Sequence, residues 1–290
     1  MTKYSSQEIR RPTTSVLITS ISGGVRREKS DVVITEEPLE IRLGDLWNEP
    51  YSYATIMRTP GNDFELVAGF LFSDHVINAR EDIHTICYCD LPLDVTQKYN
   101  IVTVTLKVPV PSNRQRQKTI DSACGVCANT TLEEIGLSFD KSDILPIEVG
   151  INVVLGLPAK LRKQQRYFNT TGGVHAVGLF SQSGELKYIR EDVGRHNALD
   201  KVLGACVLAG YRDLSNCIIV LSGRVAYELI NKAARAKVPT IVAIGAPSSL
   251  AVKLSNRAGI TLCGFTSDTT VNIYTYPSRI LTVGPPTRQL

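Results

Sequence analysis

The sequence has 290 residues, of which 43% are hydrophobic and 21% are charged. This composition excludes an intrinsically disordered chain, and the length is sufficient for one or two hydrophobic cores. The 32 Lys and Arg residues exceed the 28 Asp and Glu residues by a net charge of +4, an excess too small to indicate a nucleic-acid partner. A small phosphorylated ligand remains compatible with this charge.

The apolar runs do not predict a membrane span. The longest ones, such as residues 217–221 and 240–244, are far shorter than the ~20 residues that a membrane-spanning helix needs. Basic residues near the N-terminus are not followed by an apolar stretch with a small-residue cleavage site, as they would be in a secretory signal. We therefore expect a cytoplasmic protein with no membrane partner.

The first half of the chain predicts an arm and a small domain. Residues 1–30 are polar and lack periodicity, which predicts a flexible N-terminal arm. Residues 31–140 are predicted to form a smaller α+β domain that ends in a C-x-x-C loop, with strands at 32–44 around a Glu-Pro turn, at 51–59 and at 99–108. Asn62 and Glu65 have the spacing of a capping box ahead of an apolar stretch, which predicts a helix packed on these strands.

The second half, residues 141–290, predicts a domain of the α/β class. A helical pattern at 157–165 precedes two extended runs joined by a turn at Gly184, and helices then alternate with buried strands. Two of these helices are followed by Gly210 and Gly259, and glycine commonly ends a helix. Such alternation predicts three layers around a sheet that is largely parallel after its opening hairpin.

The seven cysteines are an odd number and too few for a disulfide scaffold. Three of them lie inside apolar runs and are predicted to be buried: Cys206, Cys217 and Cys263. Cys124 and Cys127 form a C-x-x-C pair in the segment DSACGVC, where the small neighbours predict an accessible turn. This pair is the strongest candidate for chemistry in the sequence.

The C-x-x-C pair has several interpretations, which stay open. A redox pair of the thioredoxin type opens a helix directly after a strand, a context that is not predicted here. A structural zinc site would add Cys87 and Cys89, whose C-x-C spacing departs from the usual gap between zinc ligands. The pair could also lie in a loop without any chemical role.

A further interpretation is nucleophilic thiol chemistry. One thiolate attacks the persulfide of a donor, holds the sulfur as a persulfide and releases it to an acceptor. The nearby cations Arg114, Arg116 and Lys118 favour the thiolate and attract anionic partners.

Other candidate residues cluster around predicted strand ends. His175 begins an apolar strand, and Arg195 and His196 lie in a dense ionisable segment between a strand and a helix, where ligands bind in α/β sheets. Ordinary structural roles compete with this interpretation: a histidine satisfied by a hydrogen bond, and a solvated turn in which Asp192 or Asn197 caps the helix.

Two loops, Ser222-Gly223-Arg224 and residues 245–249, each follow a predicted strand and open a helix. Their free backbone amides could bind phosphate, and routine strand-to-helix packing is the alternative. The sequence has neither a Walker A pattern nor G-x-G-x-x-G, so ordinary nucleotide hydrolysis and dinucleotide-binding Rossmann folds have no support.

A set of segments, taken together and in order, resembles the FdhD/NarQ family from about Asp31 to the C-terminus: EEPLEI, MRTPGNDFELVAGFLFSD, DSACGVC, FNTTGGVHAVGLF, REDVGRHNALDKVLG, LSGRVAYELINKAARAKVP, GAPSSLAV and GFTSDTTVNIYT. The resemblance implies a C-terminal domain of cytidine deaminase-like fold beside the smaller N-terminal domain, usually in a homodimer. A deaminase activity is not expected, because the H-x-E and P-C-x-x-C signatures of zinc deaminases are absent.

The resemblance also implies an activity. A cysteine desulfurase would load sulfur onto the C-x-x-C loop, with Cys124 as the persulfide cysteine and Cys127 as its partner. The protein would then transfer the sulfur to the bis-molybdopterin guanine dinucleotide cofactor, with molybdenum or tungsten, for formate dehydrogenase. No structural metal is expected. The alternative is a chaperone that binds this cofactor without forming a persulfide.

By the same resemblance, one segment matches the cofactor-binding stretch of the family: Phe265, Thr266, Ser267, Asp268, Thr269 and Thr270. This segment carries no Lys or Arg. Phosphate contacts are therefore expected from the other candidate residues: His175, Arg195, His196, Ser222, Gly223 and Arg224.

Overall fold

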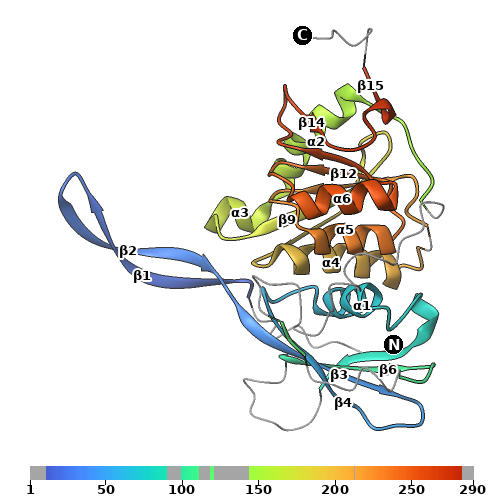
Figure 1. The fold of residues 1–290 in the computed structure, drawn as a ribbon. Helices are drawn as coiled ribbons and strands as arrows, with labels where there is room; N and C mark the ends of the chain where they lie inside the picture. The colour runs from blue at the N-terminus through green and yellow to red at the C-terminus, as the bar shows by residue number, and fades with distance from the viewer. Residues whose placement is uncertain (1–10, 90–98, 111–117, 121–143, 212, 283–290) are drawn as a thin grey trace.

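The computed structural model describes residues 11–89, 99–110, 118–120, 144–211 and 213–282 (Figure 1). It is a mixed α/β structure, as predicted, with one sheet from the N-terminal half and a larger sheet from the C-terminal half. The predicted boundary at residue 140 lies outside the described residues. The division into domains therefore stays a prediction.

A long β-hairpin opens the described chain. Strands β1 (Thr13–Ser22) and β2 (Val25–Ile34) are antiparallel and pair from end to end. Gly23 and Gly24 join them with φ angles of 56° and 77°, the left-handed geometry of a two-residue hairpin turn. Figure 1 shows the hairpin extending away from both larger sheets. Residues 13–30 of the predicted arm therefore belong to a β-hairpin, which the sequence did not predict, and the flexibility of the arm stays a prediction. The sequence pattern did not predict the hairpin because its apolar residues lie on both faces of the strands rather than alternating with polar residues.

The N-terminal sheet has the strand order β5-β6-β3-β4-β7. Its strands are β3 (Glu37–Asp45), β4 (Tyr51–Arg58), β5 (Ile83–Tyr88), β6 (Ile101–Leu106) and β7 (Lys118–Ile120). Helix α1 (Asp63–Ser73) covers one face, where Leu66 and Val67 share a core with Leu39 and Val102. A short 3-10 helix, η1 (Arg80–Asp82), precedes β5.

The predicted helix after Pro60 is confirmed as α1, but its predicted capping box is wrong. Asn62 precedes the helix with a left-handed φ of 58° and makes no side-chain capping hydrogen bond. Glu65 instead accepts a hydrogen bond from Nη2 of Arg190 at 2.7 Å. The side chain of Glu65 therefore binds Arg190, which is distant in the sequence, instead of capping the helix.

The C-terminal sheet has the strand order β10-β9-β11-β12-β13-β14. Its strands are β9 (His175–Ser181), β10 (Leu186–Asp192), β11 (Cys217–Leu221), β12 (Thr240–Ala243), β13 (Thr261–Gly264) and β14 (Asn272–Ile273). As predicted, β9 and β10 form an antiparallel hairpin and β11, β12 and β13 are parallel. Strand β14, which was not predicted, adds an antiparallel edge. A separate parallel pair joins β8 (Val149–Gly150) to β15 (Ile280–Leu281).

Helices cover both faces of this sheet (Figure 1). One face packs on α4 (Arg195–Leu208), α5 (Tyr227–Arg235) and α6 (Ser249–Ala258). The other packs on α2 (Ile151–Gln164), which is followed by α3 (Arg166–Thr171), while η3 (Pro277–Arg279) precedes β15. Gly210 and Gly259 follow α4 and α6 with positive φ, as predicted. The cytidine deaminase-like name for this domain stays a prediction.

The two halves meet where α1 crosses α4. A Cβ atom added at Gly204 would lie 1.7 Å from the carbonyl oxygen of Glu65, and one added at Gly69 would lie 1.9 Å from that of Asp200. No side chain fits at either position, so the two helix backbones are in contact. This contact fixes α4, and the residues that begin it, relative to the N-terminal sheet.

Candidate functional site

The predicted site residues of the C-terminal half gather at one edge of its sheet, where the parallel strands end. His175, at the start of β9, pairs with Asp192, at the end of β10. Ser222 follows β11 and is tied to Ala176: its Oγ accepts from the Ala176 amide at 2.8 Å, and its amide donates to the Ala176 carbonyl at 3.0 Å. Carboxyl ends of parallel strands are where α/β sheets bind ligands. We call this region the carboxyl edge.

The loops after β11, β12 and β13 are bound to one another through their backbones. The amide of Gly245 donates to the Gly223 carbonyl at 3.3 Å, and the amide of Phe265 donates to the Gly245 carbonyl at 3.2 Å. A Cβ at Gly245 would lie 2.7 Å from the Gly223 backbone, and one at Gly264 would lie 2.9 Å from Cδ of Pro247. The three loops therefore form one surface of closely packed backbone.

Three helices begin at this edge, so their N-terminal amides and dipoles make it electropositive. Ser248 caps α6 by accepting from the Ala251 amide at 3.2 Å. Gly194 before α4 and Ala226 before α5 supply no side-chain cap. The first turns of α4 and α5 are thus the better places for an anionic group.

His175 lies among cations at the carboxyl edge. Its ring faces Gly223, where an added Cβ would lie 3.0 Å from Nδ1. Partial burial, and then the neighbouring Arg195, His196 and Arg224, lower the pKa of His175 below its ordinary value of 6.5. The imidazole is therefore neutral near pH 7, available to accept a proton or a hydrogen bond.

Next to it lies a group of buried polar atoms without hydrogen-bond partners in the described part of the chain. They are Nε of Arg195, both ring nitrogens of His196 and Oε2 of Glu228. Nε2 of His196 and Oε2 of Glu228 are 3.9 Å apart, an ion-pair contact when the imidazole is protonated but beyond hydrogen-bond range. Unsatisfied buried polar groups are costly, so such atoms are candidates for a ligand's polar atoms. We call Arg195, His196 and Glu228 the polar cluster.

Glu228, on the first turn of α5, was not among the predicted site residues. Burial raises its pKa, but the neighbouring His196, the helix amides and the charge of Arg195 lower it more, so the group has a pKa below its ordinary value. The carboxylate is ionised at neutral pH. Its position one turn after the Ser222-Gly223-Arg224 loop was the available signal in the sequence.

Asp192 anchors the start of α4. Its Oδ1 accepts from the Gly194 amide and from Nδ2 of Asn197, both at 2.9 Å. Its Oδ2 accepts from the Thr59 amide at 3.2 Å and from Nζ of Lys201 at 2.7 Å. Asp192 is fully buried, and Lys201 is 1% exposed. The predicted alternative, a solvated turn in which Asp192 or Asn197 caps the helix, is therefore wrong: both residues are buried, and Gly194 precedes α4 without a side-chain cap. Asp192 instead holds the Gly194 amide just before the helix, together with Lys201 and Thr59.

The 265–270 segment also lies at the carboxyl edge. Phe265 has a left-handed φ of 48° and is 52% exposed. Thr266 is buried, and its Oγ1 has no hydrogen-bond partner among the described residues. Ser267 and Thr270 close a turn through their hydroxyls at 2.8 Å, with Asp268 and Thr269 exposed at its tip. A non-glycine residue held in left-handed backbone is a strained conformation that is common at functional sites.

Cys124 and Cys127 lie outside the described residues, as do Arg114 and Arg116. The described strand that leads to this pair is β7, which ends at Ile120 and pairs there with Ile56 of β4. The next residue of β4, Met57, accepts a hydrogen bond from Nδ2 of Asn197 at 2.8 Å. Because β7 runs parallel to β4, Ile120 lies at the end of the N-terminal sheet where Met57 contacts the first turn of α4.

The other cysteines divide by burial. Cys206, Cys217 and Cys263 are buried, as predicted, and burial raises the pKa of Cys206 and of Cys263 to about 12. Cys87 is exposed and Cys89 is half-buried. No group of three potential metal ligands occurs among the described residues. Since Cys124 and Cys127 lie outside them, the zinc alternative is untested.

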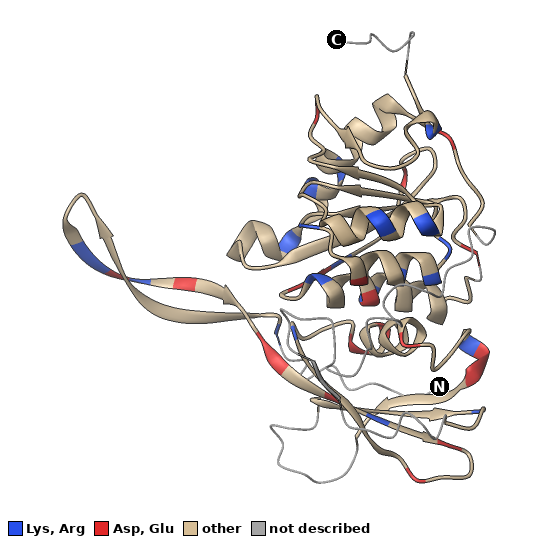
Figure 2. Cartoon of the chain, viewed as in Figure 1, with Lys and Arg blue, Asp and Glu red and all other residues tan. Residues whose placement is uncertain are grey.

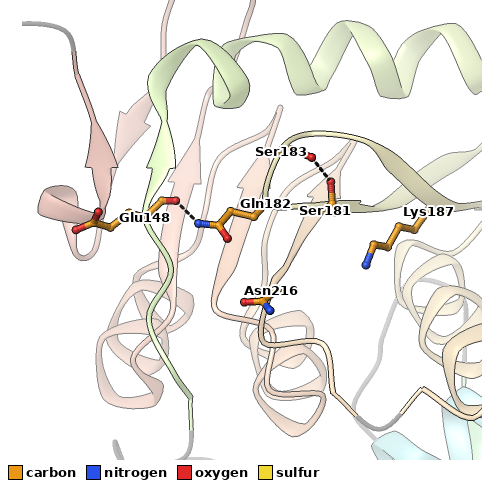
Figure 3. A pocket seen from close by; sticks show the side chains of 6 residues that line it. All are labelled: Glu148, Ser181, Gln182, Ser183, Lys187 and Asn216. Atoms are coloured by element: carbon orange, nitrogen blue, oxygen red, sulfur yellow. Dashed lines mark hydrogen bonds between the residues drawn. The ribbon is translucent and has the colours of Figure 1, made fainter.

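A polar cavity of about 520 Å³ lies at the opposite edge of the same sheet (Figure 3). It is lined by Glu148, Ser181, Gln182, Ser183, Lys187 and Asn216. None of the predicted site residues contributes to it, and its lining contains no buried polar side-chain atom without a partner. The carboxyl edge is therefore the stronger candidate.

None of the helices in the described residues combines the length and the apolar composition that a membrane span requires.

Comparison with known proteins gives a consistent result. The FdhD/NarQ family profile matches residues 34–281. A protein named sulfur carrier protein FdhD from Nocardia farcinica is 40% identical over 269 residues, which are 92% of this chain and 94% of that protein. A protein of the same name from Saccharolobus solfataricus is 42% identical over 252 residues, 87% of this chain and 91% of that protein.

One solved structure is similar over nearly the whole chain. It is described as a formate dehydrogenase accessory protein from Desulfotalea psychrophila, with a TM-score of 0.71 and 25% sequence identity. The match covers 93% of this chain and 100% of that one.

Proposed function

Because the chain belongs to the FdhD/NarQ family, we propose that it is a sulfur carrier that holds a persulfide on Cys124. The sulfur comes from a cysteine desulfurase and goes to the bis-molybdopterin guanine dinucleotide cofactor, with molybdenum or tungsten, of a formate dehydrogenase. The names of the relatives and of the similar structure support the carrier role and this client. The proposal includes a cytoplasmic homodimer whose C-terminal domain has the cytidine deaminase-like fold.

The position of Ile120 is the observation that carries the proposal. Ile120 pairs with Ile56, one residue before Met57, which is bonded to Asn197 on the first turn of α4. An extended chain spans at most ~3.6 Å per residue, so Cys124, four residues on, has a reach of about 14 Å from this point. This reach supports the proposal that the Cys124 thiol delivers sulfur near the first turn of α4.

The transfer balances as thiol exchange. The Cys124 thiolate attacks the terminal sulfur of the desulfurase persulfide, forms the Cys124 persulfide and releases the desulfurase cysteine as its thiolate. Attack by the Cys127 thiolate on Sγ of Cys124 then releases the terminal sulfur as hydrosulfide and leaves a disulfide. A cellular thiol reductant must reduce this disulfide before the next cycle.

The carboxyl edge suits the proposed acceptor. The bound cofactor supplies the metal to which sulfur is delivered, and this chain's residues hold its nucleotide ends. The first-turn amides of α4 and α5 with Arg195 and Arg224 suit phosphates, while the exposed ring of Phe265 suits base stacking. Asp268 gives its own segment a negative charge, so we assign the phosphates to the helix starts.

A maturation assay tests the sulfur step. Formate dehydrogenase activity is measured in cells that lack their own family member and carry the wild-type chain, Cys124→Ala or the control Cys87→Ala. We expect Cys124→Ala to abolish activity and Cys87→Ala, an exposed thiol outside the loop, to preserve it. Full activity with Cys124→Ala would favour the cofactor chaperone over the sulfur carrier.

A further inference from the structure

The β1–β2 hairpin has little support in this chain. Among the described residues its strands pair only with each other, while β2 contacts α3 and its last residue, Ile34, lies against Gly173 in the segment after α3. Leu17 and Ile21 on β1 are 75% and 71% exposed. A two-stranded hairpin is marginally stable in water by itself. The exposed apolar side chains and open edges therefore indicate a missing partner.

The two edges of the hairpin differ in charge. Strand β1 has the sequence TTSVLITSIS and no charged residue, whereas β2 carries Arg26, Arg27, Glu28, Lys29 and Asp31. Figure 2 shows blue and red along only one of the two strands. The carboxylate of Asp31 also accepts from the Val32 amide at 2.9 Å, which occupies a donor on that strand. Charges protect strand edges from pairing, so β1 is the edge that remains open.

The register identifies the groups that β1 presents. The two-residue turn makes Ser22 and Val25 a hydrogen-bonded pair, and the bond from the Thr35 amide to the Pro12 carbonyl continues the same alternation. Alternate residues therefore direct their N–H and C=O groups away from β2. These residues are Thr13, Ser15, Leu17, Thr19 and Ile21.

The sequence of β1 is symmetric in residue type about Leu17. Val16 and Ile18 flank it as β-branched residues, followed outward by the hydroxyl residues Ser15 and Thr19. Thr14 and Ser20 continue the pattern. In an antiparallel pairing of two copies centred on Leu17, outward-facing residues meet outward-facing residues, and Ser15 lies opposite Thr19 of the second copy. Two-fold interfaces require this kind of self-complementarity.

We propose that β1 is the dimer interface of this protein, pairing antiparallel with β1 of a second copy around Leu17 so that the two hairpins form one continuous sheet. Open backbone groups, absence of charge and residue symmetry select the same partner, whereas a foreign strand would not require the symmetry. The inference rests on the homodimer in the proposed function and is independent of the sulfur chemistry.

Sedimentation velocity of the full chain over a range of concentrations tests the interface. We expect the wild type to be a dimer. Leu17→Asp places two carboxylates opposite each other at the two-fold axis, which we expect to raise the dissociation constant at least ~10-fold. The matched control is Ser30→Asp, since Ser30 is the cross-strand partner of Leu17 on the protected strand. We expect this control to dimerise like the wild type.

A mixing experiment separates a broken interface from a misfolded hairpin. Leu17→Asp and Leu17→Lys are each expected to be monomeric, and their mixture is expected to dimerise because opposite charges then meet at the axis. A monomeric wild type, a dimeric Leu17→Asp variant or a mixture that stays monomeric would each overturn the proposal. Sulfur loading of the same samples, measured by mass, reports on the carrier function separately.

Discussion

Two sets of buried polar groups near the first turn of α4 differ in their hydrogen bonding. In the first set, both carboxylate oxygens of Asp192 are satisfied, by backbone amides, Asn197 and the ammonium group of Lys201. In the second set, Arg195, His196 and Glu228 hold atoms without hydrogen-bond partners in the described chain. Buried polar groups that are fully hydrogen-bonded make the structure rigid, whereas buried polar groups without partners are candidates for binding a ligand. The difference separates the scaffold of the carboxyl edge from its binding surface.

Removing Lys201 should break the scaffold side and have the largest effect on stability. Lys201→Met leaves the fully buried carboxylate of Asp192 without its cation, a change that typically costs about 3–5 kcal/mol. Urea unfolding of the variant measures the loss of free energy of unfolding. Lys163→Met, at an exposed position, is the control. A loss as small as that of the control would show that Asp192 is not held by this pair.

Gly204→Ala should disturb the same scaffold from the α1 side. The added methyl would lie 1.7 Å from the Glu65 carbonyl oxygen, so the two helices must separate, at about 1–3 kcal/mol. In contrast, Gly156→Ala in α2 meets nothing within 4 Å and should stabilise the protein slightly. Thermal unfolding of both variants compares them. Equal effects from the two changes would argue against the close α1–α4 contact.

In contrast to the two scaffold variants, Glu228→Gln should change ligand binding and leave stability nearly unchanged. Oε2 of Glu228 makes no hydrogen bond in the described chain, so we expect stability to change by less than about 1 kcal/mol. If the polar cluster binds the nucleotide end of the acceptor, the dissociation constant for GDP should change by about 10-fold, measured by calorimetry. The exposed Glu185→Gln serves as control. Strong destabilisation with unchanged GDP binding would place Glu228 in the scaffold.

The smallest predicted effect is the titration of His175. Its folded pKa lies below 6.5 because of burial and nearby cations, so the folded state binds fewer protons than the unfolded state in this range. Its contribution to stability is therefore present above pH 6.5 and is lost as the pH falls below that value. Removing one cation with Arg224→Ala should raise the pKa of His175, as measured by NMR. An unchanged pKa would exclude Arg224 as a neighbour.

Much of the C-terminal half could be predicted from the sequence. Buried strands such as 217–221 are short apolar runs, and glycines such as Gly259 mark helix ends, so local patterns suffice. The candidate residues gathered at one edge because Arg195 and Ser222 follow strands, whereas His175 begins a strand that runs antiparallel to β11. Helix boundaries were predicted less well: the sequence predicted a helix opening at Ser222-Gly223-Arg224, and α5 begins at Tyr227, three residues after Arg224.

What the sequence missed depends on contacts between distant segments. The partners of Asp192 include Thr59, which is 133 residues away, and no local pattern joins them. The sequence pattern predicted Glu65 as a capping residue, but its carboxylate accepts a hydrogen bond from Arg190, 125 residues away. The hairpin was missed for another reason: its apolar residues belong to none of the hydrophobic cores of the described residues, so they lack the period that a buried face imposes.

The central claim, that Cys124 carries sulfur, is tested most directly by intact mass. The protein is incubated with a cysteine desulfurase and cysteine, with and without a thiol reductant, as wild type, Cys124→Ala and Cys127→Ala. We predict a reductant-sensitive gain of one sulfur atom that is lost in Cys124→Ala. No gain in the wild type while the desulfurase turns over, or an equal gain in Cys124→Ala, would contradict it.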